Sequence, residues 1–108
     1  MALTNGFANV GRLMSHFYDH AQKLGVATPG EYLERAEQFI AGPISKGTME
    51  CRRAFTRPGD CVRYNTVTDE YGVMTRQRVI LTYYIADPAI HGHATNLEYF
   101  EVNCPPNR

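Results

Sequence analysis

The sequence has no long apolar run and no excess of charge of one sign. Its 108 residues carry 11 Lys and Arg against 11 Asp and Glu, so the formal net charge at pH 7 is zero. The longest apolar run is far below the ~18 residues of a membrane-spanning helix, and we expect no membrane span. A neutral chain has no bulk attraction for polyanions. The length suits one compact domain, so we take residues 1–108 as a single domain.

Cysteine is also scarce. The three residues Cys51, Cys61 and Cys104 are an odd number and too few for a disulfide-built scaffold. No two of them have the spacing of a metal site. We interpret them mainly as small packing residues, and one bridge remains an alternative. Residues 1–6 contain no basic stretch followed by an apolar one, so we expect no signal peptide.

Lysine is rare too, with two Lys against nine Arg. The guanidinium group is a planar fork of donors that suits phosphate or carboxylate. Six arginines fall within 27 residues: Arg52, Arg53, Arg57, Arg63, Arg76 and Arg78. Such a cluster is usually a solvated face. The alternative is a surface that stacks bases and grips phosphates, because tyrosines are interleaved with the arginines: Tyr64, Tyr71, Tyr83 and Tyr84.

Helical periodicity dominates the first half of the chain. Apolar residues follow the spacing of one helical face from Val10 to Leu24, and Gly25 provides a helix stop. A second helix begins at Thr28-Pro29-Gly30-Glu31, where the threonine can cap the helix and the glutamate completes a capping box. Gly42-Pro43 ends it. We expect residues 1–9 to be flexible.

The second half reads as short strands between turns. The turn Arg57-Pro58-Gly59-Asp60 has the composition of type II. Short runs that are closely joined indicate an antiparallel meander, here 49–56, 61–67, 71–75, 78–85 and 96–103. The fold class predicted is α+β, with two N-terminal helices packed on a four- or five-stranded antiparallel sheet. Residues 87–108 would form an extra C-terminal strand or tail.

Alternation along two of these strands predicts a polar sheet face. In 78–85 it separates Val79, Leu81, Tyr83 and Ile85 from Arg78, Ile80, Thr82 and Tyr84. In 61–66 it separates Val62 and Tyr64 from Cys61, Arg63 and Asn65. A face that carries Arg, Thr, Tyr and Asn is too polar for a second core, and we interpret it as a candidate site.

Two histidines on the first helix are candidates for proton transfer. His16 and His20 are four residues apart, so they are neighbours on the flank of the apolar stripe, with Arg12 and Lys23 close by. A half-desolvated His that remains reachable suits proton transfer near neutral pH. The plain alternative is a surface pair without function. Zinc is a further alternative, although the Glu that metalloproteases place after the first His is missing. The loop His91-Gly92-His93 could add ligands but is more typical of an exposed turn.

A series of short motifs runs through the chain in a fixed order. These are His16-Phe17-x-x-His20, Gly25, Glu31-Tyr32-Leu33-x-x-Ala36-x-x-Phe39, Gly59-Asp60-x-Val62-Arg63-Tyr64-Asn65, Tyr71-Gly72-Val73 and Ile80-Leu81-Thr82-Tyr83-Tyr84. In this order they resemble the C-terminal RNase domains of contact-dependent growth inhibition and related polymorphic toxins. That superfamily unites barnase, EndoU, the tRNA-cleaving colicins and RelE. The resemblance covers about residues 13–85.

The resemblance implies a ribonuclease without metal or cofactor, often one that cleaves tRNA. Such a domain is secreted as the C-terminal part of a larger protein and acts in the cytoplasm of a neighbouring bacterium. Its partners would be RNA, a cognate immunity protein and, as a further candidate, an activating protein of the target cell. Carried over by motif, the catalytic residues would be His16, His20, Arg63, Thr82 and Tyr84. We add four substrate-binding candidates: Arg12, Lys23, Arg78 and Tyr71.

Two features depart from the family pattern. Arg76-Gln77 stands where members usually have an Asp-Gly turn. Residues 87–108 also extend the chain beyond the usual end, as an edge strand, a specificity element or an immunity-binding element.

Metal-free RNA cleavage needs a base near the 2′-hydroxyl, an acid near the leaving 5′-oxygen and cations for the phosphorane charge. One His could be the base and the other the acid, or one His could act with Tyr84. Arg63 would hold phosphate as a bidentate donor, and Thr82 would bond phosphate or orient a His. The rival interpretations are a non-catalytic binding module that uses the polar face, and a toxin with DNase or nucleotide-transfer chemistry.

Overall fold

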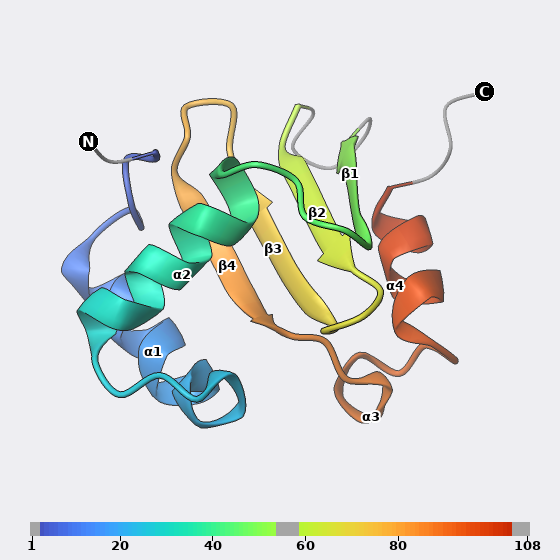
Figure 1. The fold of residues 1–108 in the computed structure, drawn as a ribbon, viewed down its shortest axis with the longest axis horizontal. Coiled ribbons are helices and arrows are strands. Elements are labelled where there is room, and N and C mark those ends of the chain that lie inside the picture. Colours follow the sequence, from blue (N-terminus) through green and yellow to red (C-terminus); the bar gives the residue numbers. More distant parts are fainter. Residues whose placement is uncertain (1–2, 54–58, 105–108) are drawn as a thin grey trace.

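The computed structural model describes residues 3–53 and 59–104 and has an α+β fold (Figure 1). The elements in chain order are α1 (Val10–Leu24), α2 (Pro29–Ala41), β1 (Thr48–Arg52), β2 (Cys61–Asn65), β3 (Glu70–Met74), β4 (Ile80–Ile85), α3 (Pro88–His91) and α4 (Asn96–Asn103). The strands form one antiparallel sheet in the order β1-β2-β3-β4. The predicted fold class is therefore confirmed. Within the described ranges, no helix is both long and apolar enough to span a membrane.

Both N-terminal helices begin and end at the residues that the sequence indicated. The Thr28 side chain accepts a hydrogen bond from the Glu31 amide (3.1 Å), while the Glu31 carboxylate accepts one from the Ala27 amide (2.6 Å). These bonds satisfy amides that the first turn leaves without helical partners. Gly25 caps α1 with a φ of 72°, a left-handed conformation that glycine adopts without strain. Together the two caps fix where α1 ends and α2 begins.

One face of the sheet, which we call the α2 face, packs against the N-terminal helices. Figure 1 shows α2 crossing in front of β3 and β4. Tyr32, Ala36 and Ile40 of α2 are fully buried. They pack in one apolar cluster with four side chains of the sheet: Cys61, Met74, Ile80 and Tyr83. This cluster is the main core and holds α1 and α2 at the β4 side of the sheet.

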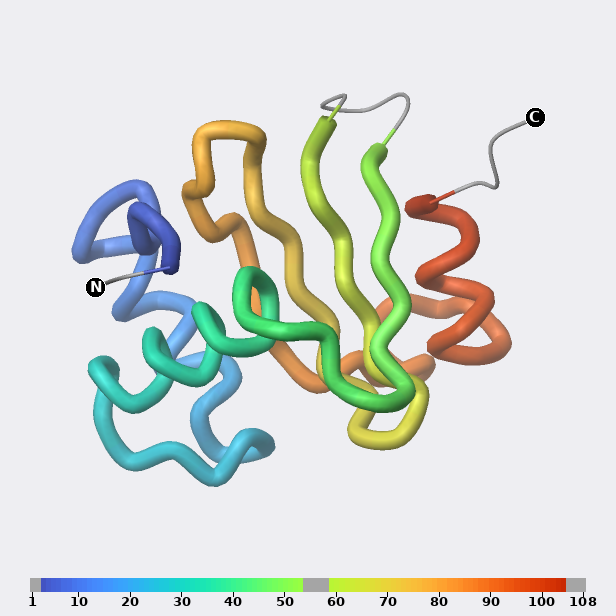
Figure 2. The backbone as a smooth tube through the Cα atoms, turned by 45° about the horizontal axis from the view of Figure 1, so that its top comes forward, coloured from blue at the N-terminus to red at the C-terminus, as the bar shows by residue number. Residues whose placement is uncertain are grey.

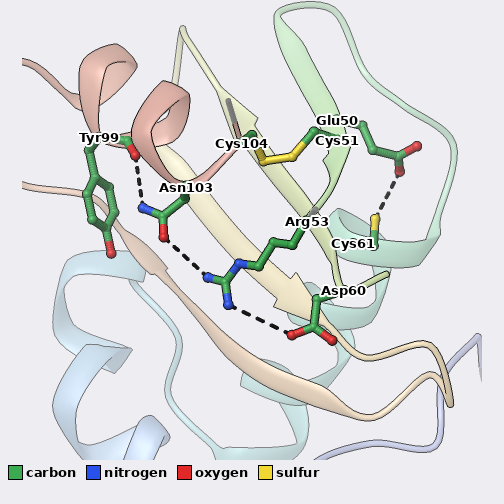
Figure 3. The surroundings of a disulfide bond; sticks show 8 residues. All are labelled: Glu50, Cys51, Arg53, Asp60, Cys61, Tyr99, Asn103 and Cys104. Atoms are coloured by element: carbon green, nitrogen blue, oxygen red, sulfur yellow. Dashed lines mark hydrogen bonds and ion pairs between the residues drawn. A yellow bond between two sulfur atoms is a disulfide. The ribbon is translucent and has the colours of Figure 1, made fainter. Parts of the chain in front are cut away.

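The opposite face, which we call the α4 face, carries a second apolar cluster. Phe100 and Cys104 pack there with side chains of the two central strands: Val62, Tyr64, Tyr71 and Val73. A disulfide joins Cys51 of β1 to Cys104 (Figure 3), whereas Cys61 is free and buried. Figure 2 shows α4 beside β1, at the far end of the sheet from α1. The expectation of a polar face is wrong here, because this face is a second core.

The segment 96–103, expected to be a strand, is the helix α4. The Thr95 side chain accepts a hydrogen bond from the Glu98 amide (3.0 Å), and Glu98 in turn accepts one from the Ala94 amide (3.3 Å). Thr95-x-x-Glu98 is thus a capping box, and it overrides the β propensity of the residues that follow. The segment 87–108, expected to be a strand or tail, contains α3 and α4 within its described part, 87–104.

Residues 3–9 are anchored to the rest of the molecule, although the sequence suggested a flexible segment. Phe7 forms a parallel bridge with Ile80 at the edge of β4. The Asn5 amide donates to the Arg78 carbonyl (2.8 Å), and the Thr4 hydroxyl donates to Glu37 (2.6 Å). The segment therefore completes the edge of the sheet and positions Phe7 against α1.

A β-bulge changes which side chains of β4 share a face. Met74 pairs with Ile80 and Val73 pairs with Thr82, so Leu81 is an extra residue between the two pairs. Ile80 consequently lies in the α2-face core and Leu81 in the α4-face cluster. The predicted grouping of Ile80 with Tyr84 is wrong for this reason. The turn expected at 57–60 falls partly outside the described residues.

Candidate functional site

The candidate site lies along the seam between α1 and β4, where two pockets open. The first, which we call the N-terminal pocket, has a volume of about 460 Å³ and is lined by Phe7, Arg12, Gln77 and Leu81 among others. The second, which we call the His20 pocket, has a volume of about 560 Å³. It is lined by α1, the end of β4 and the α3–α4 segment. The residues used below are Asp19, His20, Lys23, Tyr84, His91 and Tyr99.

The helix α1 contacts the α4 face of the sheet where His20 meets Tyr84. Their rings stack with centroids 5.3 Å apart and an interplanar angle of 28°. The His16 ring lies 5.7 Å from the His20 ring and stacks on Phe7 at 5.2 Å. The anchored N-terminal segment therefore fixes His16, and β4 fixes His20. The structure brings both imidazoles and Tyr84 together.

Burial lowers the pKa of both imidazoles below the ordinary value of 6.5. Desolvation penalises the charged ring and is the largest cause at each. For His20, the neighbouring His16 lowers the pKa further, while Asp19 raises it. For His16, Asp19 raises the pKa and Arg12 lowers it. At neutral pH both rings are neutral and can accept a proton. The Nδ1 atom of His16 is buried without a hydrogen-bond partner.

A cation stands at each end of the histidine pair on α1. Arg12 lines the N-terminal pocket and Lys23 lines the His20 pocket. Residues 12, 16, 20 and 23 follow the spacing of one helical face, so this row of α1 side chains runs along the seam. Lys23 is bound to Asp87, with Nζ 3.1 Å from Oδ2. Both predicted substrate-binding cations therefore lie beside the histidines.

Tyrosines form the floor of the seam. The hydroxyl groups of Tyr84 and Tyr99 are hydrogen-bonded at 2.8 Å. Burial is the main cause that raises the pKa of Tyr84 far above its ordinary value, so its hydroxyl stays protonated. Tyr71 lies beneath, 1% exposed, with its ring 5.4 Å from Tyr84 and 4.9 Å from Tyr99. Tyr71 was expected to bind substrate, but it is covered and supports the two partly buried rings instead.

Arg63 is not at this site, contrary to the sequence-based expectation. It extends from the α2 face, and its side chain is 11% exposed. Nε donates to Glu50 (2.6 Å), and Nη1 donates to the carbonyls of Phe39 (3.1 Å) and Gly42 (2.7 Å) at the end of α2. All of these bonds are internal, so Arg63 fastens the helix to the sheet.

Thr82 and Arg78, which were expected on one face, differ in their surroundings. Thr82 pairs with Val73, which places it on the same face as Tyr84, two residues along β4. It therefore keeps its place beside the candidate site. Arg78 adopts a left-handed backbone (φ 65°) and its guanidinium donates to the Leu3 carbonyl (3.0 Å from Nε). Arg78 thus tethers the N-terminal segment, and its substrate contact stays a prediction.

The guanidinium on the α4 face belongs to Arg53, which the sequence singled out only as one of a cluster. Figure 3 shows it reaching toward Asp60 and toward Asn103 of α4. Its Nη2 donates to Asn103 at 3.4 Å, and its Nη1 lies 3.8 Å from Asp60 Oδ2. Its charge acts to lower the pKa of Tyr71 and of Tyr84 against the effect of burial. Its position after the end of β1, in phase with Cys51, was the signal that could have found it.

The arginine cluster of the sequence is therefore no single patch. Arg53 is on the α4 face, Arg63 is on the α2 face, and Arg78 is at the β4 edge. Across 3–53 and 59–104, no three His, Cys, Asp or Glu side chains meet in a way that could hold a metal ion. The zinc alternative thus finds no third ligand beside His16 and His20 in those ranges.

Neither a scan of protein-family models nor a search of curated proteins finds a match to this chain. Any functional assignment consequently depends on the geometry of the seam and on the motif order described above.

Proposed function

We propose that the protein is a metal-independent endoribonuclease with its active site at the seam between α1 and β4. The observation that carries the proposal is the half-buried pair His16 and His20 stacked through His20 onto Tyr84 at the edge of a pocket. Two neutral imidazoles next to a protonated hydroxyl supply both a proton acceptor and a proton donor. The motif order that resembles polymorphic RNase toxins supports the same chemistry.

The residues take the following roles. His20, which lines the pocket, accepts the proton of the 2′-hydroxyl, and the 2′-oxygen attacks the adjacent phosphorus. The bond from phosphorus to the 5′-oxygen breaks, and Tyr84 is the donor in reach that can protonate the leaving oxygen. The products are a 2′,3′-cyclic phosphate and a 5′-hydroxyl. DNA lacks the 2′-hydroxyl and is not cleaved in this way.

Other side chains of the seam stabilise the phosphate. Arg12 and Lys23 flank the histidines and favour an anionic chain along α1. His16 orients and polarises His20, and Thr82 offers a hydroxyl donor on the same face as Tyr84. Arg63, held on the α2 face by its bonds to Glu50, Phe39 and Gly42, has no part in the proposed reaction.

The biological setting follows from the resemblance. The domain would be delivered as the C-terminal part of a larger secreted protein into the cytoplasm of another bacterium and would cleave RNA there, with tRNA as the first candidate. A cognate immunity protein would neutralise it by covering the seam. An activating protein of the target cell is a further candidate partner.

The direct test is cleavage of total tRNA and of plasmid DNA in the presence of EDTA. We expect the wild-type chain to cut tRNA, to leave cyclic phosphate ends, and to spare DNA. His20→Ala should lower the rate by at least ~10²-fold, since general base catalysis contributes about that much. Tyr18→Ala, on the exposed side of the same helix, is the matched control and should cleave normally.

Three other outcomes would contradict the proposal. Cleavage of DNA would indicate a DNase. Binding of nucleic acid or protein without cleavage, unaffected by replacing both histidines, would indicate a binding module. Normal RNA cleavage by folded His20→Ala would remove His20 from the mechanism.

A further inference from the structure

The His20 pocket extends beyond the proposed reaction centre toward the C-terminal part of the chain. His20 and Tyr84 form one side of it. The other side consists of residues from α3 and α4, notably His91 and Tyr99. The family resemblance ends near residue 85, so this wall belongs to the segment whose role, as an edge strand, a specificity element or an immunity-binding element, the resemblance left open.

The wall is flat, aromatic and saturated in hydrogen bonds. The rings of His91 and Tyr99 are parallel, with centroids 4.1 Å apart and an interplanar angle of 3°. The His93 amide donates to His91 Nδ1 (3.1 Å), so the His91 proton is on Nε2 and is donated to Asn96 Oδ1 (2.9 Å). The Tyr99 hydroxyl is hydrogen-bonded to the Tyr84 hydroxyl. Because the two rings stack on each other, each has at most one face left for a planar ring ligand, and that face offers π-surface rather than hydrogen bonds.

The charged groups in the pocket are two carboxylates, Asp19 and Asp87, and one ammonium group, Lys23. Lys23 and Asp87 neutralise each other in an ion pair at 3.1 Å. Asp19 also lines the pocket, and within the described chain no hydrogen bond or ion pair holds its carboxylate. The three charged residues of the pocket thus leave one negative charge, that of Asp19, without a counter-charge. Immediately beside the Asp19 carboxylate a phosphate would be repelled, whereas a group with N–H donors would be attracted.

We propose that the His20 pocket is a nucleobase subsite, formed by the α3–α4 segment, that prefers bases with an exocyclic amino group to uracil. Adenine, cytosine and guanine each present an amino group that can donate to Asp19. Uracil presents one N–H between two carbonyl oxygens, and both oxygens repel the carboxylate. The ring of the base lies against the open side of the stacked Tyr99 and His91 pair, and its phosphate lies at the side of the pocket formed by His20 and Tyr84.

This inference rests on the proposed ribonuclease function and specifies its substrate. A base held in a pocket this close to the reacting phosphate must be unstacked from its neighbours. The substrate class is therefore an unpaired RNA segment, such as a loop, rather than a regular duplex.

The test uses nucleoside 3′-monophosphates, which bind without being cleaved. They are titrated into the full chain and followed by NMR of the backbone amides, at a pH well above 6.5 so that the histidines stay neutral. We expect shifts at Asp19, His91 and Tyr99, with 3′-UMP about tenfold weaker than the best of the other three, as for one hydrogen bond to a charged group. Asp19→Asn should remove most of this preference. Glu34→Gln, on the exposed side of α2, is the matched control and should leave it unchanged.

Equal affinity for all four nucleotides, shifts confined to other surfaces, or no binding up to the solubility of the ligands would each overturn the subsite. An unchanged preference in Asp19→Asn would do so as well. The two proposals fail separately. Base-selective binding without RNA cleavage in EDTA would leave the subsite standing and reject the ribonuclease, and cleavage without binding in this pocket would do the reverse.

Discussion

At the scale of single residues, Arg63 shows how a guanidinium can serve architecture where chemistry was expected. The last carbonyl groups of a helix have no amide partners within it and carry a partial negative charge. Arg63 donates to two such carbonyls, those of Phe39 and Gly42, and to the Glu50 carboxylate. A single side chain thereby joins α2, β1 and β2.

Replacing Arg63 by Met should destabilise the fold and leave the chemistry intact. Two carbonyls and one carboxylate would lose a charged donor, which costs about 2–4 kcal/mol. Urea unfolding measures the loss, and RNA cleavage below the transition measures the activity of the folded fraction, which we expect to be unchanged. A stable Arg63→Met protein that no longer cleaves RNA would return Arg63 to the active site.

The histidine pair gives a prediction about pH. Burial lowers the pKa of His16 and His20 below 6.5, so the unfolded chain binds more protons than the folded one as the pH falls. The stability that the neutral rings contribute is complete above pH 6.5 and is lost as the pH falls through their lowered values. In the pH profile of RNA cleavage, the rate should fall on the acid side over the same pH range.

NMR titration of the ring protons measures the pKa values of His16 and His20, on which both expectations depend. Asp19 raises the pKa of each histidine, so Asp19→Asn should move the acid limb to still lower pH. Midpoints at or above 6.5 for both rings would contradict the packing of His16 on Phe7 and of His20 on Tyr84.

At the scale of elements, α4 depends on a link that is distant in the sequence. Cys51 and Cys104 are separated by 53 residues, and closing so long a loop restricts the unfolded chain. The helix is short, and few of its residues are buried. Its place on the sheet is therefore held by the disulfide, by Phe100 and by the bond from Arg53 to Asn103.

Reduction of this disulfide should lower the free energy of unfolding by about 2–4 kcal/mol. The Cys51→Ser/Cys104→Ser double variant should show the same loss without reductant and no further response to it, which makes it the matched control. Denaturant unfolding with and without dithiothreitol measures both. Equal stability of the oxidised and reduced wild type would indicate that α4 is held by packing alone.

Elements were predictable where a local signal determined them. Thr28, Glu31 and Gly25 placed the ends of α1 and α2 because capping involves residues within one turn of each other. The helix α4 was missed although Thr95 and Glu98 form the same kind of box. Its apolar residues follow no clear helical face, so the segment lacks the periodicity that indicated α1 and α2.

At the scale of the whole molecule, the sequence could place side chains within a strand but not across the sheet. Alternation correctly put Arg63 opposite Tyr64, and Tyr83 opposite Tyr84. Which side chains of different strands share one face of the sheet depends on the pairing register and on the bulge at Leu81. Arg63 consequently lies behind the sheet from Tyr84, a relation that no single segment encodes. By contrast, helical spacing alone predicts that His16 and His20 are neighbours, and the contact of α1 with β4 alone places them at the candidate site.

The fastening of both ends of the described chain has a consequence for behaviour in concentrated solution. Exposed outer strands can template the addition of a strand from another molecule. Here residues 5–7 bond to the β4 side, through the Asn5 amide and through the Gly6 carbonyl (2.8 Å from the Ile80 amide), and the disulfide keeps α4 beside β1. Each margin of the sheet is partly shielded, so we expect the protein to resist growth into intermolecular β-assemblies.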